Sequence, residues 1–234
     1  MPYRYYVLFH VVAGTVALLS FWTAAALRKG SPRHRLVGRT YLLAMLAVIA
    51  SGVPLAVQRM VDGHPVTAAF LGYLLLLTAT SVWSAWRAIR DKADPIAYTG
   101  TVYRGFAVAN VLAGGGVLAL GIQVGAPLLM GFSAIGLFAG QDMLRKRRQI
   151  LGKPLWWREE HYTAMLGNGV ATHIAFLSLG LPRLLPGIDG AALHYASWFG
   201  PLLVAVVAKV LLDRKYRVQR PVRTQPAPQL DYLF

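Results

Sequence analysis

Six long stretches without a charged residue divide this chain of 234 residues. Five of them hold between 19 and 24 residues each, at 5–27, 40–58, 63–86, 161–182 and 190–208. A helix needs about 20 apolar residues to cross the roughly 30 Å hydrocarbon core of a bilayer. These five stretches therefore predict five transmembrane helices.

The sixth stretch covers 105–141 and holds 37 uncharged residues. A single helix of that length would run about 55 Å and overshoot a bilayer. We therefore expect the chain to fold back within residues 123–127, because Gly125 allows a turn and Pro127 suits the first position of a new helix. The sequence thus predicts an all-α membrane protein with seven transmembrane helices in one domain, 1–213.

The basic residues separate cleanly on this topology. Three of the 24 Lys and Arg residues lie on one side of the predicted bundle, and the other 21 lie on the opposite side. The three are Arg4, Arg59 and Arg183. Because cytoplasmic loops are enriched in Lys and Arg, the N-terminus is predicted outside and the C-terminus in the cytoplasm. An even number of spans would place basic segments on both faces.

The excess of positive charge also indicates a partner. The chain has a net charge of +15, and 56% of its residues are hydrophobic. On this topology the charge lies at one membrane surface, where each basic residue attracts anionic lipid by about 1 kcal/mol. We therefore expect anionic lipids and no nucleic acid as partners, with a larger membrane complex as a further option. The basic, proline-rich tail 214–234 is expected to be disordered.

Local signals mark several helix ends and contacts. Ser31-Pro32 and Asp94-Pro95 pair a capping residue with a proline, and Lys153-Pro154 repeats the proline. The motif Gly136-x-x-x-Gly140 and the glycines at 114–116 predict close helix packing. No internal repeat is visible, so an inverted-repeat transporter is not favoured.

Histidines at the cytoplasmic helix ends are the main candidates for a cofactor site. His34 and Met45 share one face of the second helix, and His161 and Met165 share one face of the sixth. Neutral imidazole binds haem iron or a transition metal, and Met can also bind haem iron. The alternative is that these histidines cap helix starts and that the methionines are core residues.

Two further sites complete the candidates. Asp142 could join His34 and His161 as ligands of one metal ion, with Glu160 activating water in a membrane hydrolase. Near the outer face, His10 begins a stripe of small residues and could contact a flat ring; otherwise it is a buried histidine bonded to a neighbouring helix. No role is assigned to His64, His173 or His194, and the absence of Cys excludes a thiolate site.

Three motifs together resemble a known group of proteins. They are His10-x-x-Ala13-Gly14, Lys29-Gly30-x-x-x-His34-Arg35 and His161-x-x-x-Met165-Leu166-Gly167. The chain is similar over most of 7–216 to the bacterial membrane proteins grouped as domain of unknown function 2306. The resemblance implies a bacterial inner-membrane location and draws attention to His10, His34 and His161. It implies no activity.

Three functional hypotheses follow. The first is a b-type haem or quinone-linked electron-transfer protein that uses His34 and His161, with His10 as a further candidate. The second is the metal-dependent hydrolase described above. The third is a non-catalytic role in transport or in the assembly of a membrane complex, in which the histidines are structural.

Overall fold

The computed structural model describes residues 3–185, 187 and 190–216, and these ranges contain helices and no strand. The elements in chain order are α1 (Tyr3–Ala26), α2 (Pro32–Val61), α3 (Pro65–Arg90), α4 (Pro95–Tyr98), α5 (Thr101–Gln123), α6 (Pro127–Gly152), α7 (Trp156–Ala175), the π-helical segment η1 (Phe176–Gly180), α8 (Leu181–Leu184) and α9 (Ala191–Lys215).

Seven of the described helical segments are long and apolar enough to cross a membrane. Two of them are composite, because α4 and α5 form one segment and α7, η1 and α8 form another. The fold-back is confirmed: α5 ends at Gln123 and α6 begins at Pro127. The protein therefore has the architecture of a multi-pass membrane protein. The predicted tail lies largely beyond residue 216, outside the described residues.

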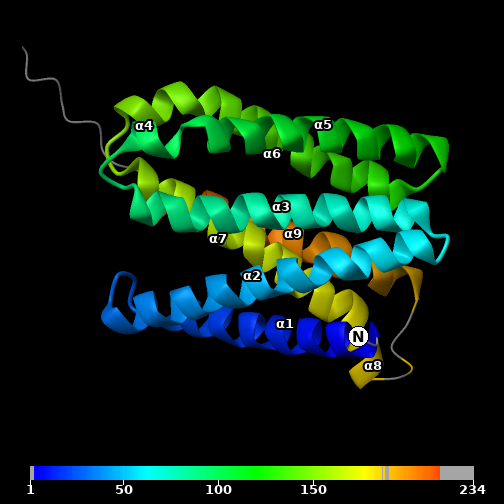
Figure 1. Cartoon of the computed structure of the whole chain (residues 1–234). Helices are drawn as coiled ribbons and strands as arrows, with labels where there is room; N and C mark the ends of the chain where they lie inside the picture. Colours follow the sequence, from blue (N-terminus) through cyan, green and yellow to red (C-terminus); the bar gives the residue numbers. More distant parts are fainter. Residues whose placement is uncertain (1–2, 186, 188–189, 217–234) are drawn as a thin grey trace, which may run out of the picture.

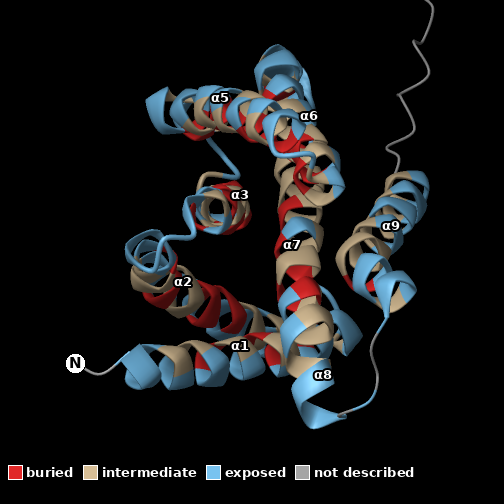
Figure 2. Ribbon diagram, turned by 90° about the vertical axis from the view of Figure 1, so that its right-hand side faces the viewer, coloured by how far each residue is buried: buried red, intermediate tan, exposed pale blue. Residues whose placement is uncertain are grey.

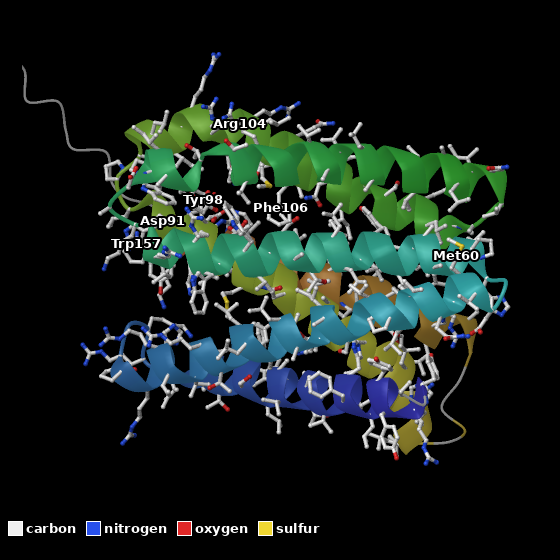
Figure 3. All side chains as sticks on the ribbon, in the orientation of Figure 1. Met60, Asp91, Tyr98, Arg104, Phe106 and Trp157 are labelled. Carbon is white, nitrogen blue, oxygen red and sulfur yellow. The ribbon has the colours of Figure 1, made fainter. Side chains whose placement is uncertain are left out.

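The bundle has two chemically different ends. The N-terminus and the end of α9 lie at opposite ends of the bundle (Figure 1). Asp91, Tyr98 and Trp157 lie at one end, whereas Met60 lies at the other (Figure 3). We call the first the basic end, because it holds the loops around residues 27–31, 91–94 and 153–155 and the end of α9. We call the second the far end.

Helix starts at the basic end follow the capping signals, with one exception. The Ser31 side chain accepts a hydrogen bond from the His34 backbone N–H at 3.2 Å, and the Asp94 side chain accepts from Ala97 at 2.9 Å. The expectation of a helix starting at Pro154 is wrong, since α7 begins two residues later. The reason is Leu155, whose left-handed backbone (φ 54°) interrupts the helix.

The helices pack as two hairpins around a central pair (Figure 2). The α1–α2 and α5–α6 hairpins flank α3 and α7, which pack against each other. The predicted close approach of α5 and α6 is confirmed, because a Cβ on Gly114 would lie 2.9 Å from the Leu137 backbone nitrogen. Helix α9 lies at the side of the bundle against α7, and Ser197 is its one buried residue.

Candidate functional site

His34 lies in the first turn of α2, at the basic end. Its Nδ1 is 3.0 Å from the backbone carbonyl oxygen of Ala24, at the end of α1. A carbonyl oxygen only accepts hydrogen bonds, so Nδ1 carries the proton and the neutral ring keeps its lone pair on Nε2. Lys29 donates to the same oxygen, also at 3.0 Å. These two bonds tie the start of α2 to the last carbonyls of α1.

His161 has the same bonding pattern on a different pair of helices. Its Nδ1 donates to the backbone carbonyl of Ala85 in α3, at 3.0 Å. His34 and Lys29 both lie close enough to His161 to act on it electrostatically. The fold therefore places two imidazoles at the basic end, each with its Nδ1 engaged and its Nε2 free of any hydrogen bond within the described residues.

The two methionines lie deeper, among packed side chains. Met45 is 2% exposed, and its sulfur lies 3.5 Å from the Thr172 hydroxyl oxygen, which donates its one hydrogen to the Asn168 carbonyl at 2.9 Å. Met165 packs against the same cluster, which includes Tyr41 and Ala164. Both methionines thus pack as core side chains.

Asp142 is not grouped with the two histidines. It is exposed and forms an ion pair with Lys146 on its own helix, at 2.8 Å. Across residues 3–185, 187 and 190–216, no three His, Asp or Glu side chains lie close enough to hold a metal ion. The three-ligand metal site expected from His34, Asp142 and His161 is therefore not assembled.

His10 lies in the half of α1 nearer the far end, where its ring forms a hydrogen bond to α2. Its Nδ1 is 2.9 Å from the Ser51 hydroxyl oxygen. That hydroxyl donates its own hydrogen to the carbonyl of Ala47 at 2.7 Å, so it accepts from His10. The geometry matches the alternative expectation of a histidine bonded to a neighbouring helix. His173 is bonded through both ring nitrogens, to Trp22 and Gly169.

A second polar cluster, centred on Glu159, joins three parts of the basic end. Its carboxylate forms ion pairs with Lys146 of α6, with Lys153 in the loop before α7 and with Lys209 of α9. Sequence spacing gave no sign of this cluster, because its members come from separate segments.

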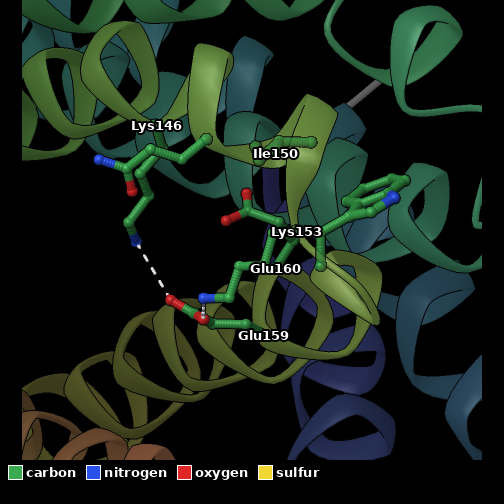
Figure 4. Close-up of a pocket in the computed structure, with 7 residues that line it drawn as sticks. Lys146, Ile150, Lys153, Glu159 and Glu160 are labelled. Atoms are coloured by element: carbon green, nitrogen blue, oxygen red, sulfur yellow. Dashed lines mark hydrogen bonds and ion pairs between the residues drawn. The ribbon is translucent and has the colours of Figure 1, made fainter. Parts of the chain in front are cut away.

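Next to this cluster is a small cavity of about 20 Å³, lined by Lys146, Gln149, Ile150, Lys153, Trp156, Glu159 and Glu160 (Figure 4). That volume holds about one water molecule. The Glu160 carboxylate accepts a hydrogen bond from the Tyr98 hydroxyl at 3.0 Å. A cavity of this size has no room for an organic substrate.

Comparison of the chain with protein-family models, with curated proteins and with solved structures found no match. At the basic end, the imidazoles of His34 and His161 each have a free ring nitrogen that could bind a metal. The charged side chains of the Glu159 cluster instead form ion pairs with one another.

Proposed function

We propose that this protein spans the bacterial inner membrane seven times, with its basic end in the cytoplasm and its N-terminus outside. The uneven distribution of Lys and Arg between the two ends supports this orientation. The resemblance of the His10, His34 and His161 motifs to domain of unknown function 2306 supports the bacterial origin. A reporter fused after Val124, in the α5–α6 turn, is expected to read as periplasmic.

We further propose that His34 and His161 bind a b-type haem and that the protein takes part in electron transfer. The observation that carries this proposal is the matched bonding of the two imidazoles. Each ring gives its Nδ1–H to a main-chain carbonyl, which leaves Nε2 as the ligand atom. A bound haem would supply one-electron chemistry at its iron.

The surrounding residues support ligand binding in two ways. The carbonyls of Ala24 and Ala85 hold the rings in one tautomer and orientation, and such a bond to the second nitrogen makes an imidazole a better ligand. Lys29 lies next to His34, and its positive charge would attract the carboxylate groups of a bound haem. Neither Met45 nor Asp142 is needed in this arrangement.

The test is an optical spectrum of the protein purified in detergent from haem-replete cells. We expect a Soret band that is lost in His34→Ala and in His161→Ala. His64→Ala is the matched control, because His64 lies at the far end before α3 and makes no capping bond through its side chain. Its spectrum is expected to match that of the wild type.

Three outcomes would overturn the haem proposal. One is a folded but colourless preparation that also fails to bind added haem. Another is a preparation that contains a bound quinone and no haem, which would favour a quinone-linked role. The third is a colourless protein that co-purifies with a larger complex, which would favour a structural role in assembly.

A further inference from the structure

Three cationic side chains from separate segments lie at the basic end. Lys29 follows α1, Arg158 lies in the first turn of α7, and Lys215 ends α9. The Arg158 guanidinium lies 4.7 Å from the ring centroid of Tyr216, and the Lys215 ammonium lies 5.7 Å from the same centroid. Burial, and then the nearby Lys215, lower the pKa of Lys29 below its ordinary value. Arg158 and Lys215 thus flank one aromatic ring, and the positive charge of Lys215 also acts on Lys29.

No described carboxylate balances these charges. Within the residues that the structure describes, neither Lys29, Arg158 nor Lys215 forms an ion pair with Asp or Glu. The nearest acidic residues in sequence are engaged elsewhere. Glu159 pairs with Lys153, and Asp213 pairs with Lys209 at 2.8 Å. The cations of the cluster are therefore free of direct ion pairs within the described residues.

The side chains are held in place and still have free donors. The Lys29 ammonium donates to the carbonyls of Ala24 and Ala25 at 3.0 and 2.6 Å, and an ammonium has three N–H bonds. Arg158 donates from Nη2 to the Tyr216 carbonyl at 3.0 Å, and a guanidinium has five. Each side chain thus keeps at least one N–H for an anion.

The position of the cluster indicates where this anion comes from. All three residues lie at the ends of membrane-spanning segments, which is the level of lipid headgroups. Val207, Leu211 and Lys215 follow one another at intervals of four, so they share one face of α9. Val207 is 51% exposed and Leu211 is 58% exposed. This face combines an apolar surface for an acyl chain with a cation at its headgroup end.

We propose that Lys29, Arg158 and Lys215 bind the phosphate of an anionic membrane lipid, whose acyl chain lies along the Val207 and Leu211 face of α9. The proposal goes beyond a general attraction of basic loops to the membrane, because it names one site and one chain face. It does not depend on haem, since none of these residues is a proposed iron ligand and Lys29 alone lies beside the proposed haem site.

The experiment measures lipid binding to the full chain by native mass spectrometry, with equal amounts of phosphatidylglycerol and phosphatidylcholine. We expect preferential retention of phosphatidylglycerol by the wild type. The double variant Lys29→Gln/Lys215→Gln is expected to lose about tenfold in affinity for it. Arg90→Gln/Lys92→Gln is the matched control, because it removes two positive charges at the same end but outside the cluster, and it is expected to bind as the wild type does.

Two further arms test the site itself. Arg158→Lys keeps the charge but loses the fork of donors, and it is expected to bind phosphatidylglycerol more weakly than the wild type. Inorganic phosphate at millimolar concentration is expected not to displace the lipid. Equal losses in both double variants, no loss in the first, or displacement by inorganic phosphate would each overturn the proposal. Circular dichroism of each variant shows whether the helices are intact.

Discussion

The hydroxyl of Tyr73 lies inside the hydrogen-bond ladder of α6, next to Gly136. It accepts from the Gly136 backbone N–H at 2.8 Å and donates to the Phe132 carbonyl at 2.8 Å. These two backbone groups are four residues apart and would bond to each other in a regular helix. A Cβ at position 136 would lie 2.7 Å from the Tyr73 hydroxyl oxygen, so the insertion needs glycine there.

Tyr73→Phe is therefore expected to destabilise the protein. The variant leaves the Gly136 N–H and the Phe132 carbonyl without their partner in a buried region, at a cost of about 1–3 kcal/mol. Thermal unfolding in detergent, followed by circular dichroism, measures the effect. Tyr195→Phe removes an exposed hydroxyl and serves as the control. An unchanged melting temperature for Tyr73→Phe would mean that α6 closes its own ladder.

Gly140→Ala is expected to weaken the α5–α6 hairpin. A Cβ at this position would overlap the Ala107 carbonyl oxygen, and backbone cannot move aside as a flexible side chain can. We expect a loss of about 1–3 kcal/mol of unfolding free energy. Gly116→Ala is the matched control in the same hairpin, since nothing lies within 4 Å of its new Cβ. Equal stability of the two variants would contradict the close contact.

These contacts show which parts of the fold could be predicted from the sequence. The uncharged stretch 105–141 is too long for one span, and Gly125 and Pro127 placed the α5–α6 turn within it. The motif Gly136-x-x-x-Gly140 indicated close packing. It gave no sign that Tyr73 fills the space beside Gly136, because that contact depends on how α3 is rotated against α6.

The candidate site was predictable to a similar extent. The predicted topology placed His34 and His161 at the same end, and in the structure both lie near helix starts at the basic end. Their carbonyl partners, Ala24 and Ala85, belong to other helices and have no side-chain signal in the sequence. Asp142 was grouped with the histidines by depth alone. In the structure it pairs instead with Lys146, one turn away on the same helix.

Asn168→Leu is expected to leave the stability unchanged or to raise it. Asn168 is fully buried in α7, and neither polar atom of its amide has a hydrogen-bond partner in the described structure. Replacing an unpaired buried amide by an apolar group of similar size removes a desolvation cost of about 1–3 kcal/mol. Thermal unfolding measures the change.

Asn110→Leu provides the comparison for that experiment. Asn110 is equally buried, but its Nδ2 donates to the Thr80 hydroxyl at 2.8 Å and to the Phe106 carbonyl at 2.7 Å. The loss of these bonds is expected to lower the melting temperature. A lower melting temperature for Asn168→Leu as well would show that its amide binds a water molecule or another polar partner.

Glu159→Gln is expected to loosen α9 from the rest of the bundle. Helix α9 has Ser197 as its one buried residue, so it depends on contacts at its two ends. At the basic end, Glu159 lies 4.0 Å from Lys209 of α9 and also pairs with Lys146 and Lys153. Neutralising the shared carboxylate removes the charge that links these three lysines, which costs about 1 kcal/mol at a partly exposed site. Exchange of the backbone amide hydrogens is expected to become faster in 203–215 but not in α3.

The control is Asp62→Asn at the far end, which is expected to change the exchange rate in neither segment. Equal protection of α9 in the Glu159 variant and the wild type would show that packing of Trp198 and Phe199 against Phe132 holds this helix without the ion pairs.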